Sequence, residues 1–390
     1  MNHRRMTYIA GAAIILWPVS VLADAGTPLV WGSTFHLFLG NAIIGLFEGW
    51  LLARFFGLSK RRCIGFLIPA NYLSAWIGFM LMSFLFDRFA TDIYSGLRVT
   101  WLLIAATYLL TLIVEWPFVA LCFRGTQHWF MGSIKGSVLI QSASYVLLFG
   151  GYWLLSGTSL YTNMNVVLPG QISAPRGVVM FFISCSDGDV YRSELGSFTD
   201  AKVAELDSTN HWEDHLELKE SQVDSNYWDL AAVLERRQTV VLLPHISSIR
   251  QIAPDQAYRT SQYGGWGIAP FQVGVATNSN WRFGWANWPD VGMWGRNGPR
   301  TVRIAYGIPF GGWSPCRVIH LPDDKVLLQL GDHQICLVDI SDRKIALIRN
   351  GYGVLAFQKD QISETSSPAN GSQPIRSETN RTSSAAGSRR

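Results

Sequence analysis

The first 157 residues of this chain contain few charged side chains, and most of those lie in short basic segments between long apolar runs. From about Thr158 the composition is that of an ordinary globular domain. A run of about 20 apolar residues is long enough to cross a membrane as a helix. The sequence therefore predicts a membrane protein that carries a soluble domain.

The chain also lacks a clustered basic surface and a convincing set of catalytic residues. From Thr158 to Asp360 there are 21 acidic and 18 basic residues, so the net charge of +4 does not come from this part. Nucleic-acid-binding domains concentrate positive charge on one face, and we therefore exclude nucleic acid as a partner. Because no nucleophile, base and metal set stands out, we predict neither an enzyme nor a bound cofactor.

Cysteine is scarce. Cys63 and Cys122 stand at the basic ends of predicted helices, and Cys185, Cys316 and Cys336 belong to the globular part. Compartments outside the cytoplasm are oxidising, which allows a disulfide between Cys316 and Cys336. The odd number leaves three reduced cysteines as an equal alternative.

The first 25 residues have the three-part pattern of a secretory signal peptide. Arg4 and Arg5 precede an apolar stretch from Tyr8 to Leu22, and Ala23-Asp24-Ala25 follows. This pattern predicts cleavage after Ala25. An uncleaved first helix is the alternative, and in both cases the next residues begin outside the cytoplasm.

Four further apolar runs predict a four-span transmembrane bundle over residues 26–157. They are Val30 to Gly57, Cys63 to Phe86, Val99 to Phe123 and Gly136 to Ser156. The loops with unbalanced positive charge, Arg54 to Arg62 and Arg124 to Lys135, should be cytoplasmic. The chain then leaves the fourth span on the outside, which predicts a multi-pass protein of the cell inner (plasma) membrane with an extracytoplasmic C-terminal domain.

Two glutamates interrupt these apolar runs at matched depth. Glu48 and Glu115 each lie about nine residues before a basic segment. A carboxyl in lipid must be protonated or paired, and it marks a functional or structurally critical point. Other polar residues lie on one face of each predicted helix and reach the same layer at 1.5 Å per residue. The predicted intramembrane cluster is Glu48, Glu115, Asn41, Asn71, Gln141 and Ser144.

The cluster supports two interpretations. Glu48 and Glu115 could form a coupled pair that binds a cation or relays protons, with Asn71, Gln141 and Ser144 as neutral ligands or donors. Alternatively, polar side chains on facing helices hold the helices together at about 0.6–2 kcal/mol per contact.

The globular part has the alternating patterns of β-strands. Val178 to Cys185 and Val190 to Leu195 flank an Asp187-Gly188 turn and predict a hairpin. Near the end, four short strands with intervening turns predict an antiparallel meander: Cys316 to Leu321, Lys325 to Leu330, Gln334 to Ile340 and Lys344 to Arg349. These strand pairs resemble those of periplasmic β-propeller repeats, in which one blade has this size. A β-sandwich fits the pattern equally well.

The fold class is therefore α+β, with the helical bundle followed by a mostly β domain over residues 178–360. We predict one helix in this domain, near Asn226 to Arg237. Residues 158–177 have the composition of a linker, and residues 361–390 that of a disordered tail.

Six tryptophans lie between Tyr263 and Trp313, among glycines and asparagines. Exposed rings beside amides suit a glycan or a protein partner, and Trp281, Trp285 and Trp288 are the candidate binding surface. The alternative is that the rings fill a β core. His211 and His215 have helical spacing in an acidic stretch, but His-Trp-Glu-Asp-His does not match the zinc-peptidase patterns, and a solvated acidic face explains it.

Three functions follow as hypotheses. The first is a receptor-like or scaffold protein whose β domain binds a ligand, glycan or partner, with membrane lipid around the helices. The second is a proton- or cation-coupled transport component that uses Glu48 and Glu115. Four helices are few for a transporter, so this function predicts a homo-oligomer. The third, a membrane-tethered enzyme, has no catalytic set to support it.

Overall fold

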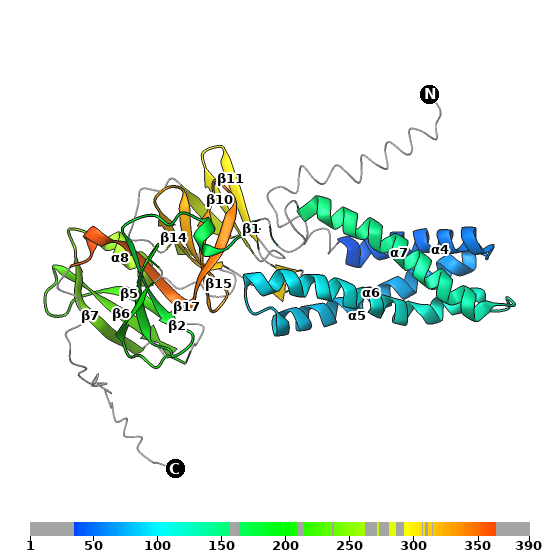
Figure 1. Cartoon of the computed structure of the whole chain (residues 1–390), viewed down its shortest axis with the longest axis horizontal. Coiled ribbons are helices and arrows are strands. Elements are labelled where there is room, and N and C mark those ends of the chain that lie inside the picture. Colours follow the sequence, from blue (N-terminus) through cyan, green and yellow to red (C-terminus); the bar gives the residue numbers. More distant parts are fainter. Residues whose placement is uncertain are drawn as a thin grey trace, which may run out of the picture.

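The structure is a computed structural model with α+β architecture. It describes residues 35–156, 162, 164–197, 199–209, 214–235, 238–261, 271–272, 281–285, 292–305, 307–308, 311–313 and 315–363. Long helices make up residues 35–156, and a β domain follows at one end of them (Figure 1). The predicted signal peptide and nearly all of the predicted tail lie outside the described residues.

Four helices form the helical part. A π-helical turn, His36–Gly40, leads into α4 (Asn41–Phe56), and α5 (Lys60–Phe89), α6 (Ile93–Phe123) and α7 (Trp129–Ser156) follow. Three of these segments are long and apolar enough to cross a membrane: His36–Phe56, Lys60–Phe86 and Ile93–Phe123. The fourth predicted span lies within α7, which is not one of these three.

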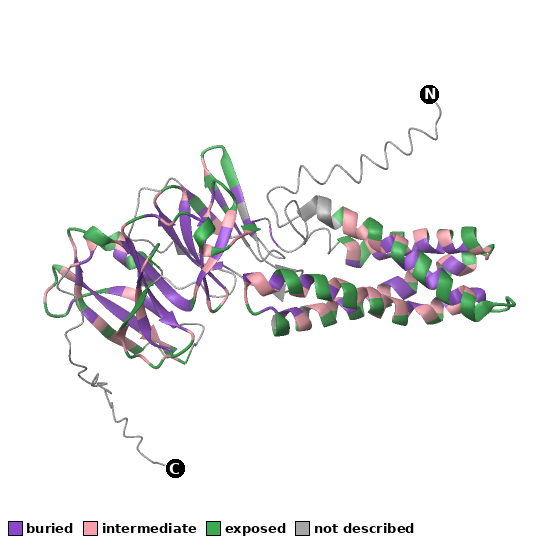
Figure 2. Cartoon of the chain, in the orientation of Figure 1, coloured by how far each residue is buried: buried purple, intermediate pink, exposed green. Residues whose placement is uncertain are grey.

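The helices pack in order along the chain, and α4 also contacts α7. Two glycines of α4 allow α5 to approach closely. A Cβ atom added to Gly45 would lie 2.7 Å from the Ile68 Cα, and one added to Gly49 would lie 2.8 Å from the Ile64 Cα. Small residues of this kind let helix backbones come together. Large apolar side chains of the helices are exposed, for example that of Ile113 at 71%, and Figure 2 shows exposed and partly buried residues along the helices.

The β domain is built around a curled nine-stranded sheet. The strand order is β4-β3-β2-β17-β16-β15-β14-β8, and β1 adds to β17. The strands are β1 (Asn165–Val166), β2 (Val178–Ser184), β3 (Val190–Glu194), β4 (Asp200–Ala204), β8 (Phe271–Gln272), β14 (Pro315–Leu321), β15 (Lys325–Leu330), β16 (Gln334–Asp339) and β17 (Lys344–Gln358).

The described residues of the domain also form three smaller sheets. One contains β5 (His215–Glu220), β6 (Tyr227–Leu234) and β7 (Gln238–Ser248), a second contains β9 (Arg282–Trp285), β10 (Gly292–Asn297) and β11 (Arg300–Ala305), and a third pairs β12 (Gly307–Ile308) with β13 (Gly311–Gly312). The domain also contains a short helix, α8 (Pro254–Tyr258), and the single turns Pro169–Gln171, Arg259–Ser261 and Lys359–Gln361.

Strand β17 joins the predicted hairpin to the predicted meander. Its first part pairs with β16 and its second part with β2, and Gly353 lies at the irregularity between Tyr352 and Leu355 with a φ of 62°. The predicted strands are therefore present, but they belong to one continuous curled sheet. The separate four-stranded blade that the propeller resemblance implied is not formed.

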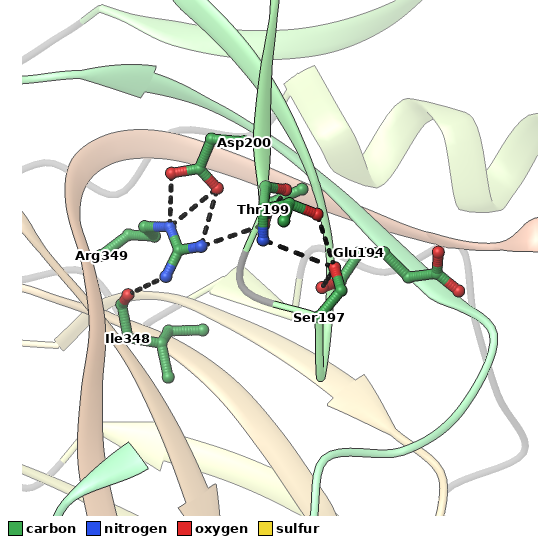
Figure 3. A network of polar contacts seen from close by, with 7 residues as sticks. Glu194, Ser197, Thr199, Asp200, Ile348 and Arg349 are labelled. Carbon is green, nitrogen blue, oxygen red and sulfur yellow. Dashed lines mark hydrogen bonds and ion pairs between the residues drawn. The ribbon is translucent and has the colours of Figure 1, made fainter. Parts of the chain in front are cut away.

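An ion pair crosses the curl of this sheet (Figure 3). Arg349 of β17 donates to both oxygens of Asp200 on β4, from Nε at 2.9 and 2.7 Å and from Nη2 at 2.7 Å. Its Nη2 also reaches Ser193 Oγ at 3.3 Å, and its Nη1 donates to the Ile348 carbonyl at 2.6 Å. Bidentate contacts of this kind fix geometry, so the pair holds the edge strand β4 against β17.

A buried arginine links the sheets at the centre of the domain. The Nη1 of Arg317 donates to the carbonyls of Leu216 and Val354, and its Nη2 donates to the carbonyl of Thr260, each at 3.2 Å. These acceptors lie on β5, on β17 and in the turn after α8. Because buried carbonyls need donors, Arg317 on β14 holds these three elements together.

One prediction for the β domain is wrong, and one pair of alternatives is resolved. The segment predicted as a helix near Asn226 to Arg237 contains β6, the central strand between β5 and β7. Of the two alternatives for the cysteines of this domain, the structure has the reduced one, because Cys316 and Cys336 form no disulfide. Cys316 lies on β14 and Cys336 on β16, with β15 between them, and two strand spacings of about 4.8 Å exceed the reach of a disulfide.

The segment predicted as a linker contributes to the β domain. Asn165 and Val166 form β1, which pairs in parallel with Lys344 and Ile345 of β17.

Most strands of the β domain are coloured as buried in Figure 2, so the main core of the molecule lies in this domain.

Candidate functional site

Helix α4 brings Glu48 to the point where the helices meet. Glu48 lies between Gly45 and Gly49, the two positions at which α5 approaches α4, and its side chain is fully buried. Asn71 of α5 donates from Nδ2 to Glu48 Oε2 at 2.7 Å. The same nitrogen donates to the Leu67 carbonyl at 3.0 Å, which fixes the orientation of the Asn71 amide.

Helix α6 brings the second carboxyl, Glu115, into the same buried region. Ser74 of α5 donates from its hydroxyl to Glu115 Oε1, and Gln141 of α7 donates from Nε2 to Glu115 Oε2. Ser144 donates to the Gln141 carbonyl at 3.1 Å, and its hydroxyl also lies near the Glu48 carboxyl. Glu48 and Glu115 interact electrostatically with each other.

The structure therefore brings together five of the six residues predicted for this cluster. The sixth, Asn41, is buried but donates to the Leu37 carbonyl of its own helix at 3.3 Å. Ser74 is in the cluster although the predicted set omits it, and its spacing of three residues from Asn71 on an amphipathic face is the signal that could have included it. We call Glu48, Asn71, Ser74, Glu115, Gln141 and Ser144 the carboxyl cluster.

The carboxyl cluster has no cationic side chain. None of the ion pairs among the described residues involves Glu48 or Glu115. Three of the four carboxyl oxygens accept hydrogen bonds, whereas Glu48 Oε1 is buried without one of normal geometry. A buried polar atom without a partner is costly, so this oxygen is the place at which the cluster can take up a proton or an ion.

A second feature is the contact between the α5–α6 turn and the β domain. Ile93, the first residue of α6, is fully buried in a core that also contains Val318, Leu328 and Val338. The Ile93 backbone N–H donates to Gln334 Oε1 at 2.8 Å. An Asp92 capping box shapes the turn, because the Asp92 carboxylate accepts from the backbone N–H groups of Tyr94 and Ser95.

Further contacts surround this junction. His333 Nε2 lies 2.8 Å from the Thr91 carbonyl, and the Tyr94 hydroxyl donates to the Val167 carbonyl at 3.0 Å. The rings of Phe86 and Trp313 pack with their centroids 5.8 Å apart. The helical part and the β domain thus share apolar packing and specific hydrogen bonds, rather than a flexible connection alone.

The structure changes which tryptophan is a candidate for the binding surface. Trp281 is 4% exposed, packs in the core with Phe283 and donates to Asp324 Oδ1 at 3.0 Å, so it cannot line an open surface. Trp285 ends β9, and Trp288 lies outside the described residues. Trp294 on β10, by contrast, is 42% exposed.

Trp294 lies on the outer face of the β9–β11 sheet. The other face carries Phe283, Met293, Val302 and Ile304, all of which are buried. Register places Trp294 opposite Gly284, whose missing side chain leaves room for the indole: a Cβ there would lie 2.6 Å from Trp294 Cζ2. Arg296 stands directly opposite Arg282, two residues along from this pair, and both arginines are exposed. Since cross-strand partners share a face, two arginines lie on the same face as an exposed indole and to one side of it.

His211 and His215 have helical spacing in the sequence, but His215 does not lie on a helix. His215 is a buried residue of β5, and His211 lies outside the described residues. Within the described part of the chain, no group of three or more His, Cys, Asp or Glu side chains has metal-binding geometry.

No protein family, curated protein or solved structure matches this chain. Its function must therefore be inferred from the carboxyl cluster, the α5–α6 junction and the outer face of the β9–β11 sheet.

Proposed function

We propose that this protein is a membrane-anchored binding protein whose β domain recognises an anionic ligand, namely an acidic glycan or the acidic surface of a partner. The outer face of the β9–β11 sheet is the binding surface. The apolar helices anchor the domain in the cell inner (plasma) membrane, and they transmit its state to the carboxyl cluster.

The observation that carries this proposal is the arrangement of Arg282, Trp294 and Arg296 on one exposed face. Like charges directly opposite each other destabilise a sheet, so the Arg282–Arg296 pair costs stability unless an anion neutralises it. An exposed indole offers a flat apolar surface on which a sugar ring or an apolar side chain can pack. Guanidinium groups beside it would bind carboxylate or sulfate groups in a bidentate manner.

The α5–α6 junction supports a link between binding and the membrane. Ile93 belongs to the same apolar core as Phe283 and Met293, which underlie the proposed binding face. Helices α5 and α6 carry Asn71, Ser74 and Glu115. A change in the packing of this core would therefore act on the helices that hold the carboxyl cluster.

Topology supports an extracytoplasmic β domain. The junction puts the α5–α6 turn on the same side as the β domain, and the basic loops around Arg61 and Arg124 lie at the other ends of these helices. Excess positive charge favours the cytoplasmic side. With α7 as a fourth span, the polypeptide enters the β domain on the side opposite to the basic loops.

A binding experiment tests this function. Full-length protein in nanodiscs of phosphatidylcholine is titrated with heparin oligosaccharides, which are acidic, and with neutral chito-oligosaccharides. We expect binding of the acidic probe that weakens with added salt. Replacing both Arg282 and Arg296 by Gln should weaken it at least about tenfold, because charge-assisted hydrogen bonds contribute about 1.5–3 kcal/mol each.

The control is Arg250→Gln, which removes an exposed arginine elsewhere on the β domain. Trp294→Ala should also weaken binding, without a change in its salt dependence. Equal affinity of the double variant and the Arg250→Gln variant for heparin would show that this face is not the binding surface.

A second candidate function is a proton- or cation-coupled transport component. Glu48 Oε1, buried without a hydrogen-bond partner beside a second carboxyl, favours it. Flux of protons and of Na⁺ driven by a pH gradient is measured in vesicles that contain the protein. Loss of flux in a folded Glu48→Gln, Glu115→Gln variant supports transport, whereas a scaffold tolerates both substitutions. As four helices are few for a transport path, this function also predicts a homo-oligomer.

A further inference from the structure

In the carboxyl cluster, the side chains that contact the two carboxyls act as hydrogen-bond donors and not as acceptors. We infer that it is a proton-binding site, with the proton on Glu48 Oε1, and that it does not bind metal cations. This inference concerns the same carboxyls as the second candidate function. It does not require that protons cross the membrane.

Donors from two helices, α5 and α7, surround the carboxyls of α4 and α6. The Asn71 amide donates to Glu48 Oε2, and the Ser74 hydroxyl and the Gln141 amide donate to the two oxygens of Glu115. Three of the four carboxyl oxygens thus already accept a hydrogen. Glu48 Oε1 is the exception, and it is fully buried.

The charges around Glu48 make a proton necessary. The titratable groups that face it are Glu115 from α6 and Tyr145 from α7, both of which interact with it electrostatically. From α5 it meets the neutral Asn71. None of these groups carries a positive charge, and two carboxylates in an apolar interior are strongly disfavoured without one.

The two carboxyls are not equivalent. Glu115 accepts one donor on each oxygen and is suited to the anionic form. The Ser74 hydroxyl also lies 3.1 Å from the Asn71 carbonyl, but its contact with Glu115 Oε1 is the shorter one and takes its single hydrogen. Glu48 accepts one donor from Asn71 on Oε2, which leaves Oε1 as the oxygen that can carry a hydrogen. The Ser144 hydroxyl lies near this carboxyl, and its own hydrogen is directed to the Gln141 carbonyl. Its lone pair is therefore available to accept the Glu48 proton.

The amide orientations argue against a metal cation. Hard cations require several oxygen ligands. For Asn71 to turn its oxygen toward a cation at Glu48, its nitrogen would have to leave both Glu48 Oε2 and the Leu67 carbonyl. The Gln141 nitrogen likewise faces Glu115. A proton fits this arrangement without any rotation of the side chains.

Infrared spectroscopy tests the inference on full-length protein in phosphatidylcholine vesicles. At pH 7 we expect the C=O band of a protonated carboxyl, and this band should move to lower frequency when glutamate is labelled with ¹³C at its side-chain carboxyl. It should persist in Glu115→Gln and be lost in Glu48→Gln. Ser137→Ala is the control, because Ser137 of α7 is buried but makes no hydrogen bond to the cluster. Exchange of Na⁺ for choline should leave the band unchanged.

Four results would overturn the inference. They are no glutamate band in the unsubstituted protein, a band retained in Glu48→Gln but lost in Glu115→Gln, a band that disappears only in the double variant, and a band that Na⁺ removes. Gln is a neutral isostere of the protonated acid, so a Glu48→Gln protein that does not fold would also count against a protonated Glu48. A band with the expected behaviour but no flux would reject transport alone and leave the proton site in place.

Discussion

At the residue scale, a buried histidine of the β domain should contribute to the loss of stability in acid. His320 on β14 is buried against Phe283, with ring centroids 5.3 Å apart, and its Nδ1 has no hydrogen-bond partner. Burial, and then the charge of Arg259, lower its pKa from 6.5 to about 4. The folded state therefore binds fewer protons than the unfolded state between pH 4 and pH 6.5. The stability from a neutral His320 is complete above pH 6.5 and is lost as the pH falls toward 4, by about 3 kcal/mol in all.

His320→Phe should remove most of this pH dependence. The measurement is the thermal unfolding midpoint of the β domain, followed by tryptophan fluorescence of the full-length protein in detergent between pH 7 and pH 4. The unsubstituted protein should lose stability over this range more steeply than the variant does. Parallel curves for the two proteins would show that another group controls acid stability.

The two thiols near β15 give a second prediction at this scale. Burial raises the pKa of the Cys316 thiol to about 12, and burial also raises the pKa of Cys336. Since the thiolate is the reactive form, iodoacetamide at pH 8 should leave both residues unmodified in the native protein. After unfolding without a reductant, both should be alkylated, as mass spectrometry would show. Persistent protection after unfolding would instead indicate the disulfide that the structure lacks.

At the scale of the element, the contact between α4 and α5 depends on glycine. Gly49→Ala places a Cβ 2.8 Å from the Ile64 Cα, so α4 must move away from α5. We expect a loss of about 1–3 kcal/mol from this overpacking, accompanied by a longer Asn71–Glu48 contact. Gly65→Ala on α5 is the matched control, because no atom lies within 4 Å of the added Cβ. Thermal unfolding of the purified protein should separate the two variants, and equal midpoints would contradict close packing at Gly49.

Local sequence patterns predict some helices and strands correctly and others wrongly. The apolar runs with basic ends indicate α4, α5 and α6 directly, and the depth of Glu48 and Glu115 anticipates their meeting. Strand β6 was misread because Leu230-Ala-Ala-Val-Leu234 contains strong helix formers, whereas pairing with β5 and β7 decides its structure. The exposure of Trp294 depends on which face of β10 covers the core, and that requires the partner strands.

At the scale of the whole molecule, the helical part and the β domain should be stabilised by each other. Ile93→Ala removes a buried side chain of a helix from the core of the β domain, and such truncations cost about 2–5 kcal/mol. We expect faster amide hydrogen exchange in β14–β16 of the full-length protein in nanodiscs. Leu97→Ala on the same helix, at a position that is 39% exposed, is the control. Unchanged exchange in β14–β16 after Ile93→Ala would show that the two parts are independent.

The sequence could not reveal this junction, since its contacts join residues far apart in the chain. The loop from Asp87 to Arg98 has the composition of a simple connection, and Gln334 looks like any polar strand residue. Their partnership becomes visible only when β16 is placed beside the start of α6.

The same junction has a consequence for the order of events during synthesis. Ile93 and Gln334 are 241 residues apart, and at roughly 5–20 residues per second the ribosome needs on the order of 10–50 s to make the chain between them. During that time the apolar residues of the turn between α5 and α6 are not yet covered by the β domain. The β domain must then fold around a segment that is already in place, so the helices act as the template on which its last strands close.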